Sequence, residues 1–277
     1  MDATTEPSFP PTSQLVWWPF AALLVLLVGA GLIGDAAGAG EQWSQVAAAG
    51  WYVGWAAWAA WLCRRHAVHM RHLFRAPRMP AAWGNVMMAF PLLLFSVGLF
   101  WLQVVLGSFV APEFVHGWLA GEPNATPSST PLASALALLI TVGLAPVVEE
   151  LVFRGVLLRS WSRRRGRTHA LLATAALFAV LHPADLLGSF VFGVVLGGIR
   201  FRTGTLVVPI VCHALHNALT ELLASDAVIG SNSGEGPILT VAKLQSLWWV
   251  GVLCVVIASV PIWIFLRRHL PCRPPVR

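Results

Sequence analysis

Residues 247–266 read LWWVGVLCVVIASVPIWIFL, a stretch without a charged side chain that is followed at once by Arg267 and Arg268. An α-helix rises about 1.5 Å per residue, so a stretch of this length can cross a hydrocarbon core about 30 Å thick. Inside lipid every backbone N–H and C=O group needs a partner within the segment, which a helix provides. The stretch therefore predicts a transmembrane helix.

The composition extends this prediction to the whole chain. Of the 277 residues, 57% are hydrophobic and only 11% are charged, and the mean hydropathy is +0.72. A soluble chain typically carries about a quarter charged residues. The formal net charge of +6 comes from basic residues that cluster between apolar runs, a pattern that indicates membrane orientation. We therefore expect an all-α membrane protein with the lipid bilayer as a partner, and we expect no nucleic acid partner.

Two common extracellular features are missing from the sequence pattern. The four cysteines are far apart and form no CxxC pair, which argues against a disulfide framework and against a zinc knuckle. Residues 1–14 lack the positively charged start of a cleavable signal peptide, so we expect the first apolar run to be retained.

Apolar runs divide the chain into about eight predicted transmembrane helices. No fixed-period repeat separates them, so residues 1–277 are interpreted as a single polytopic membrane domain. The predicted helices cover residues 15–33, 46–63, 82–110, 132–162, 168–182, 186–200, 205–224 and 247–266.

The loops between these runs alternate in charge. Residues 64–78, residues 163–167 and the tail after residue 266 are basic, whereas residues 35–41, 112–131 and 225–236 contain acids and no Lys or Arg. Lys243 is the one basic residue on the acidic side. By the positive-inside tendency this pattern predicts a multi-pass protein of the cell (inner or plasma) membrane with both termini in the cytoplasm.

Ionisable groups inside the predicted helices point to function. Such a group costs about 2.5–3.5 kcal/mol at the centre of a membrane helix, so it usually faces a polar interior. Glu149 lies sixteen residues before Arg165, and His182 lies sixteen residues after Gly166. If the chain turns between Arg165 and Gly166, the two side chains reach the same depth, near the bilayer midplane.

Two further polar residues complete a candidate reaction centre. His213 and Asn217 are four residues apart and share one helical face. Glu149 is positioned to act as a general base on a water held between it and His182. The neutral imidazole of His213 and the amide of Asn217 would then donate hydrogen bonds to the oxyanion.

The neighbours of these residues have supporting or structural interpretations. Glu150 and Arg154, at i and i+4, are expected to form an ion pair, which leaves Glu149 for chemistry. His216 points about 60° away from the face of His213, and Cys212 about 100° away, so both are placed outside the site. Gly193 and Gly197 fit a face for close helix packing.

At these residues the sequence resembles the CAAX-protease and bacteriocin-processing (Abi) family. Residues 149–155, EELVFRG, are similar to its EExxxR motif, residues 178–182, FAVLH, to FxxxH, and residues 213–217, HALHN, to HxxxN. The resemblance covers residues 132–223, the predicted catalytic core. It implies an eight-helix intramembrane endopeptidase that uses a glutamate-activated water, with no metal and no cofactor, and that cleaves near the carboxyl end or membrane-anchored part of its substrate. It also implies that Glu149 and His182 hold the water, that His213 and Asn217 stabilise the oxyanion, and that Glu150 and Arg154 support them.

Other interpretations of the same residues stay open. Glu149, His182 and His213 are a possible zinc ligand set with one open position, which would make the chain a zinc-dependent membrane protease. The polar groups are also compatible with hydrogen bonding between helices in a non-proteolytic membrane protein, or with the midplane site of a transporter. For a protease, the substrate classes are a prenylated protein, a pheromone or bacteriocin precursor, and the membrane-anchored tail of an exported protein.

Overall fold

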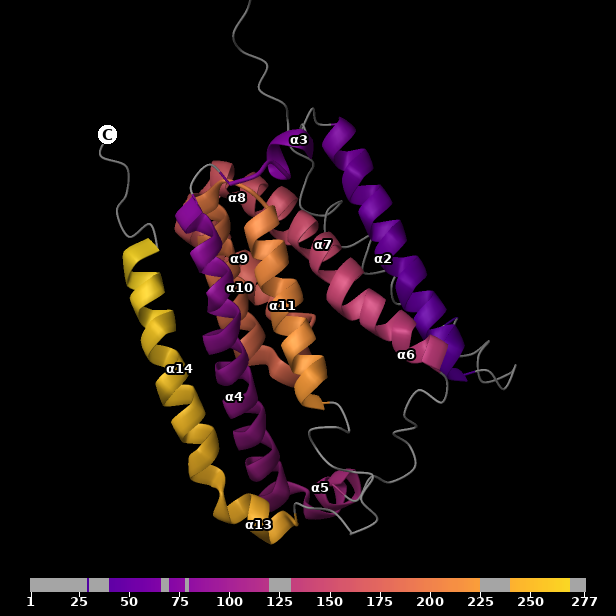
Figure 1. Ribbon diagram of the computed structural model, residues 1–277, viewed down its shortest axis with the longest axis vertical. Helices are drawn as coiled ribbons and strands as arrows, with labels where there is room; N and C mark the ends of the chain where they lie inside the picture. Colours follow the sequence, from indigo (N-terminus) through magenta and orange to yellow (C-terminus); the bar gives the residue numbers. More distant parts are fainter. Residues whose placement is uncertain are drawn as a thin grey trace, which may run out of the picture.

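Helices make up all the regular structure in the part of the chain that the computed structural model describes, which is residues 29, 40–65, 70–77, 80–119, 131–224 and 240–269. Over these residues the predicted all-α fold class is confirmed. The helices form three groups that lie side by side (Figure 1).

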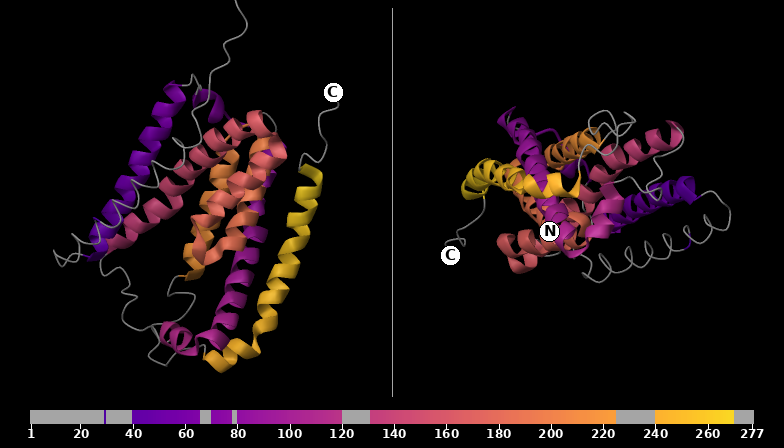
Figure 2. Two further views of the ribbon diagram at one scale, coloured as in Figure 1. Left: turned by 180° about the vertical axis from the view of Figure 1, so that it is seen from behind. Right: turned by 90° about the horizontal axis from the view of Figure 1, so that it is seen from below.

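The first group is a long, interrupted helix with a second helix beside it. It runs through α6 (Pro131–Leu138), α7 (Ala145–Glu150) and α8 (Leu158–Arg165). Helix α2 (Gly40–Arg65) lies alongside it at the edge of the molecule (Figure 2). The two joins in the long helix are π-helical, at Leu139–Leu144 and Leu151–Leu157.

These π-helical turns correct the prediction of a uniform helix over residues 132–162. A π-turn bonds residue i to i+5; such turns are rare and are frequently found at functional sites. The second π-turn follows Glu150 directly and contains Arg154. Hydropathy does not report such turns, because a change in backbone hydrogen bonding leaves the apolar content of the sequence the same.

The second group is the centre of the bundle, made of α9 (Arg167–Val180), α10 (Leu186–Thr203) and α11 (Val207–Ala224). Gly166 (φ 83°) makes the turn from α8 to α9, and Gly204 (φ 69°) ends α10. Both φ values are strained for residues with a Cβ atom. The turn at Gly166 confirms the hairpin predicted there.

Helices α9 and α10 approach each other at two glycines. A Cβ atom on Gly193 would lie 2.9 Å from the Cα atom of Ala175, and one on Gly197 would collide with Leu171. The predicted close-packing face is therefore confirmed.

Helix α9 ends before His182, which corrects the predicted helix over residues 168–182. Pro183 has no N–H group and disfavours helical geometry at the preceding residue. His182 accordingly has φ −124° and ψ 63°, and a short 3₁₀ turn, Pro183–Asp185, follows it. Asp185 then starts α10 by accepting a hydrogen bond from the Gly188 N–H at 3.1 Å.

The third group is an outer helix pair, α4 (Ala89–Val110) and α14 (Trp248–His269). A 3₁₀ segment, Pro80–Met88, leads into α4, and the short helices α5 (Pro112–Leu119) and α13 (Val241–Ser246) lie at the far end of the pair. A Cβ atom on Gly98 would lie 2.8 Å from the carbonyl oxygen of Gly251, so the two helices touch through their backbones. The outer faces expose large apolar side chains, as a lipid-facing surface does: Phe100, Phe109, Val256, Ile257, Val260 and Trp263.

Four helices in the described part of the chain are long and apolar enough to cross a membrane. They are Ala82–Val110, Ser134–Arg165, Pro183–Thr203 and Trp248–His269, and two shorter apolar helices are Arg167–Val180 and Val207–Leu223. The predicted span over residues 46–63 corresponds to α2, and the one over residues 15–33 lies outside the described residues apart from Gly29. The chain is therefore a multi-pass membrane protein, while eight crossings stay a prediction.

The basic connections gather at one end of the bundle. The α8–α9 turn, the α10–α11 turn, α3 (Met70–Leu73) and the end of α14 lie together at the top of Figure 1, opposite α5 and α13. The Thr205 hydroxyl bridges this end by donating to the carbonyl oxygens of Leu73 and Arg75, at 3.1 and 2.7 Å. This arrangement agrees with the prediction that the basic loops lie on the same side of the membrane.

Candidate active site

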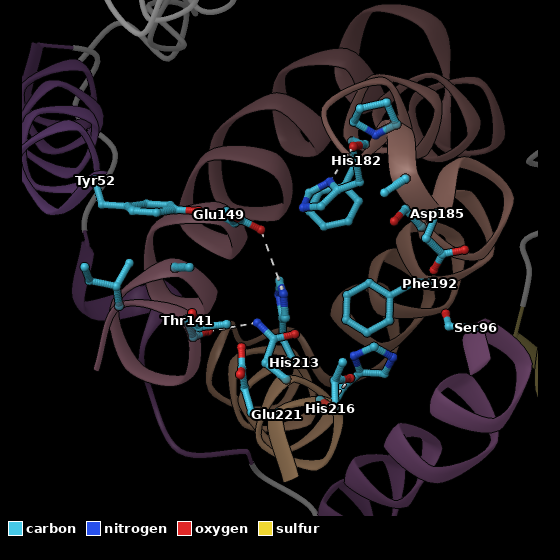
Figure 3. Close-up of a pocket in the computed structure, with 18 residues that line it drawn as sticks. Tyr52, Ser96, Thr141, Glu149, His182, Asp185, Phe192, His213, His216 and Glu221 are labelled. Atoms are coloured by element: carbon cyan, nitrogen blue, oxygen red, sulfur yellow. Dashed lines mark hydrogen bonds and ion pairs between the residues drawn. The ribbon is translucent and has the colours of Figure 1, made fainter. Parts of the chain in front are cut away.

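A cavity of about 370 Å³ lies between the three helix groups (Figure 3). Side chains from α2, α4, the first π-turn, α7, α9, α10 and α11 line it. All four residues predicted to form the reaction centre are among them: Glu149, His182, His213 and Asn217. Residues separated by almost seventy positions in sequence therefore meet at one cavity, at depths set by the α8–α9 and α10–α11 turns.

Glu149 lies near the end of α7 and is only 6% exposed. Its Oε1 atom accepts a hydrogen bond from the Tyr52 hydroxyl at 2.8 Å. Its Oε2 atom is 3.8 Å from His213 Nε2 and has no hydrogen-bond partner among the described residues. A buried carboxylate oxygen is normally hydrogen-bonded, so Oε2 is the atom available to a water molecule or a substrate.

Glu150, the next residue of the helix, contacts different partners. Its Oε1 atom is 2.7 Å from Arg154 Nη1 and 3.0 Å from His213 Nδ1, and the three side chains are at most 4% exposed. The predicted Glu150–Arg154 ion pair is therefore confirmed. Arg154 also donates to the Gly193 carbonyl at 3.3 Å, which ties α10 to the same network.

This network determines which nitrogen of His213 carries a proton. A carboxylate held by a guanidinium accepts hydrogen bonds, so Nδ1 is protonated. In the neutral ring Nε2 would then be an acceptor, and it becomes a donor only in the imidazolium form. With this tautomer, donation from Nε2 to an oxyanion, which stays a prediction, would need the imidazolium form, between Glu149 and Glu150.

His182 reaches the cavity from the loop after α9. Its Nδ1 atom lies 2.8 Å from the Phe178 carbonyl oxygen, and that oxygen can only accept. Nδ1 is therefore protonated, and the lone pair is on Nε2. The ring stacks on Phe178 with centroids 4.4 Å apart. This stacking and the Nδ1 hydrogen bond fix the orientation of the imidazole.

Asn217 lies one turn after His213 on α11. Its Nδ2 atom donates to the Thr141 carbonyl at 2.8 Å, in the first π-turn. An amide nitrogen has two hydrogens, so the second one is available to an oxygen atom in the cavity.

Two phenylalanines form the apolar frame of the site. Phe178 packs between His182 and the Arg154 guanidinium, whose carbon lies 4.8 Å from the ring centroid. Phe192 contacts the His213 ring edge-on at 4.8 Å. Phe178 is the first residue of the FxxxH motif. Its contacts with His182 and Arg154 explain why an aromatic side chain suits this position.

The structure also tests two residues placed outside the site. Cys212 is fully buried in the core and does not line the cavity, as predicted. His216 does line the cavity, with its ring 4.7 Å from Phe192, while its exclusion from the reacting groups stays a prediction.

Sequence reasoning missed Tyr52 and Thr141, which contact Glu149 and Asn217. Thr141 acts through its backbone, which no side-chain pattern reports. Tyr52 is the single tyrosine of the chain, within an apolar helix, and this was the available signal. Among the described residues, no group of three or more His, Cys, Asp or Glu side chains has a geometry that would hold a metal ion.

Comparison with known proteins adds a family to this geometry. Residues 131–219 match the family model described as type II CAAX prenyl endopeptidase Rce1-like. No curated protein and no solved structure matches the chain at a significant level. The matched segment begins at α6 and ends within α11. It contains all three motifs, at residues 149–155, 178–182 and 213–217, whereas Tyr52 lies outside it.

Proposed function

We propose that the chain is an intramembrane endopeptidase of the glutamate type. The proposal proceeds from the match of residues 131–219 to the Rce1-like family of type II CAAX prenyl endopeptidases, which makes the chain a membrane protease. Its substrate is a membrane-anchored protein or peptide, cut near the carboxyl end or the anchored part. A substrate of this kind is favoured because the cavity lies within a bundle that contains helices long and apolar enough to cross a membrane.

The reaction proceeds by direct attack of water. Glu149 Oε2 takes a proton from a water molecule whose other hydrogen points to His182 Nε2. The water oxygen bonds to the carbonyl carbon, and the carbonyl oxygen becomes an oxyanion that accepts hydrogen bonds from His213 Nε2 and Asn217 Nδ2. The carbon–nitrogen bond then breaks, and the proton on Glu149 passes to the leaving amine.

One observation carries this proposal. The two oxygens of Glu149 are in different environments: Oε1 is held by Tyr52, whereas Oε2 has no hydrogen-bond partner among the described residues and faces His213 across 3.8 Å. Glu150 Oε2 also has no hydrogen-bond partner among the described residues, but Glu150 does not line the cavity, whereas Glu149 does. A base needs one oriented oxygen that is open to the reacting water.

The function is tested by mapping the cleavage products. Membranes from cells that produce the wild-type chain, Glu149→Gln or Glu221→Gln are compared by mass spectrometry of protein termini. We expect new carboxyl termini of membrane proteins with the wild type and with Glu221→Gln, whose glutamate lines the same cavity, but not with Glu149→Gln. Identical sets of termini with and without Glu149 would refute the proposal.

A metal-free mechanism makes a separate prediction. The Arg154 guanidinium and His213 Nδ1 contact the same Glu150 oxygen, at 2.7 and 3.0 Å, and this nearby cation disfavours a dication at the site. We therefore expect the purified protein to keep its activity after exhaustive chelation. Elemental analysis of the active preparation measures this directly. Stoichiometric zinc that is lost together with activity and restores it on return would assign the same residues to a zinc protease instead.

The orientation gives a third test. We propose that the end of the bundle with the basic turns faces the cytoplasm, and that both chain termini lie on that side. Reporters fused after Arg167 and Arg277 should therefore read as cytoplasmic, and a reporter fused after Pro131 as external. Inverted labelling at Arg167 and Arg277 would overturn this orientation.

A further inference from the structure

Tyr52, the single tyrosine of the chain, forms a hydrogen bond with the proposed general base, Glu149. The residue lies on α2, outside the segment that matches the family. Helix α2 packs against α6 and α7, and in Figure 3 the Tyr52 ring extends from α2 toward Glu149. Its hydroxyl donates to Glu149 Oε1 at 2.8 Å. The Trp51 and Tyr52 rings are also in edge contact, with centroids 4.7 Å apart.

This hydrogen bond removes a freedom that a glutamate otherwise has. The last torsion of a glutamate side chain is broad and roughly two-fold, so an unrestrained carboxylate exchanges its two oxygens. With Oε1 held by Tyr52, only Oε2 remains directed at the cavity and at His213. Proton transfer needs a fixed heavy-atom geometry, and Tyr52 supplies it without touching the reacting atoms.

We propose that Tyr52 is a positioning residue that acts through Glu149, and that α2 therefore completes a reaction centre whose other groups come from residues 131–224. This role rests on the proposed function. It assigns to α2 a part in the chemistry beyond lipid contact and helix packing.

The kinetic test is Tyr52→Phe in the purified protein, assayed on a peptide that carries the cleavage site mapped by mass spectrometry. We expect kcat to fall roughly 10- to 100-fold, the rate equivalent of one charge-assisted hydrogen bond, and KM to change by less than about two-fold. Thr220→Val is the matched control, because it removes another cavity hydroxyl, one that donates to the His216 carbonyl. It should leave kcat unchanged. A wild-type kcat in Tyr52→Phe, or an equal loss in Thr220→Val, would overturn the positioning role.

A spectroscopic test needs no substrate. Because the chain has a single tyrosine, biosynthetic labelling with 3-fluorotyrosine gives one ¹⁹F resonance from the protein. We expect Glu149→Gln to shift this resonance and Glu221→Gln to leave it in place. Glutamine can still accept from Tyr52 but carries no charge, so an unchanged resonance in Glu149→Gln would show that the phenol does not contact a charged carboxylate.

The two proposals fail in different ways. If Glu149→Gln is inactive while Tyr52→Phe has normal kcat, only the role of Tyr52 is wrong. If Glu149→Gln is active but shifts the resonance, the contact exists and the proposed protease mechanism is wrong.

Discussion

Replacing Arg154 by Met is expected to lower the free energy of unfolding by about 3–5 kcal/mol, because it leaves a buried carboxylate without its cation. Glu150 is 0% exposed and Arg154 is 2% exposed, with Nη1 2.7 Å from Glu150 Oε1. The variant also loses the hydrogen bond to the Gly193 carbonyl and the contact with the Phe178 ring. Reversible unfolding by SDS in mixed micelles measures the loss.

Two controls separate the buried charge from the substitution itself. Arg165→Met makes the same change at an exposed position of α8 and should cost less than about 0.5 kcal/mol. The double variant Glu150→Gln, Arg154→Met removes both charges and should be more stable than Arg154→Met alone. An Arg154→Met protein as stable as Arg165→Met would contradict the buried ion pair.

Much of the fold follows from hydropathy and turn residues. The apolar runs predicted the helices of the bundle, and Gly166 and Gly204 are the positive-φ positions where the chain reverses. Residue spacing from those turns brought Glu149 and His182 to the same cavity. It succeeded because helices have a fixed rise, so turn positions determine depth.

The parts that sequence reasoning missed depend on details that hydropathy does not encode. The π-turns at Leu139–Leu144 and Leu151–Leu157 change hydrogen bonding but not which residues are apolar. Tyr52 reaches Glu149 through the packing of α2, ninety-seven positions away in sequence. The proton on His213 Nδ1 follows from its distance to Glu150, which no residue pattern reports.

The second large effect is expected on catalysis. Glu149→Gln keeps the size of the side chain and an oxygen that can accept from Tyr52, so the fold should be retained. An amide does not take a proton from water at neutral pH, and loss of a general base typically costs about 10²–10⁴-fold in rate. Glu221→Gln is the matched control, since Glu221 lines the same cavity and has no role in the proposed reaction.

The central claim is that Glu149 is the base of a water-mediated peptide hydrolysis. Its most direct test is the ratio of single-turnover cleavage rates for the wild type and Glu149→Gln, measured on the purified, correctly folded proteins with the mapped cleavage-site peptide. The predicted ratio is at least about 100, with Glu221→Gln within a few-fold of the wild type. A Glu149→Gln protein that cleaves the peptide at near the wild-type rate would contradict the claim.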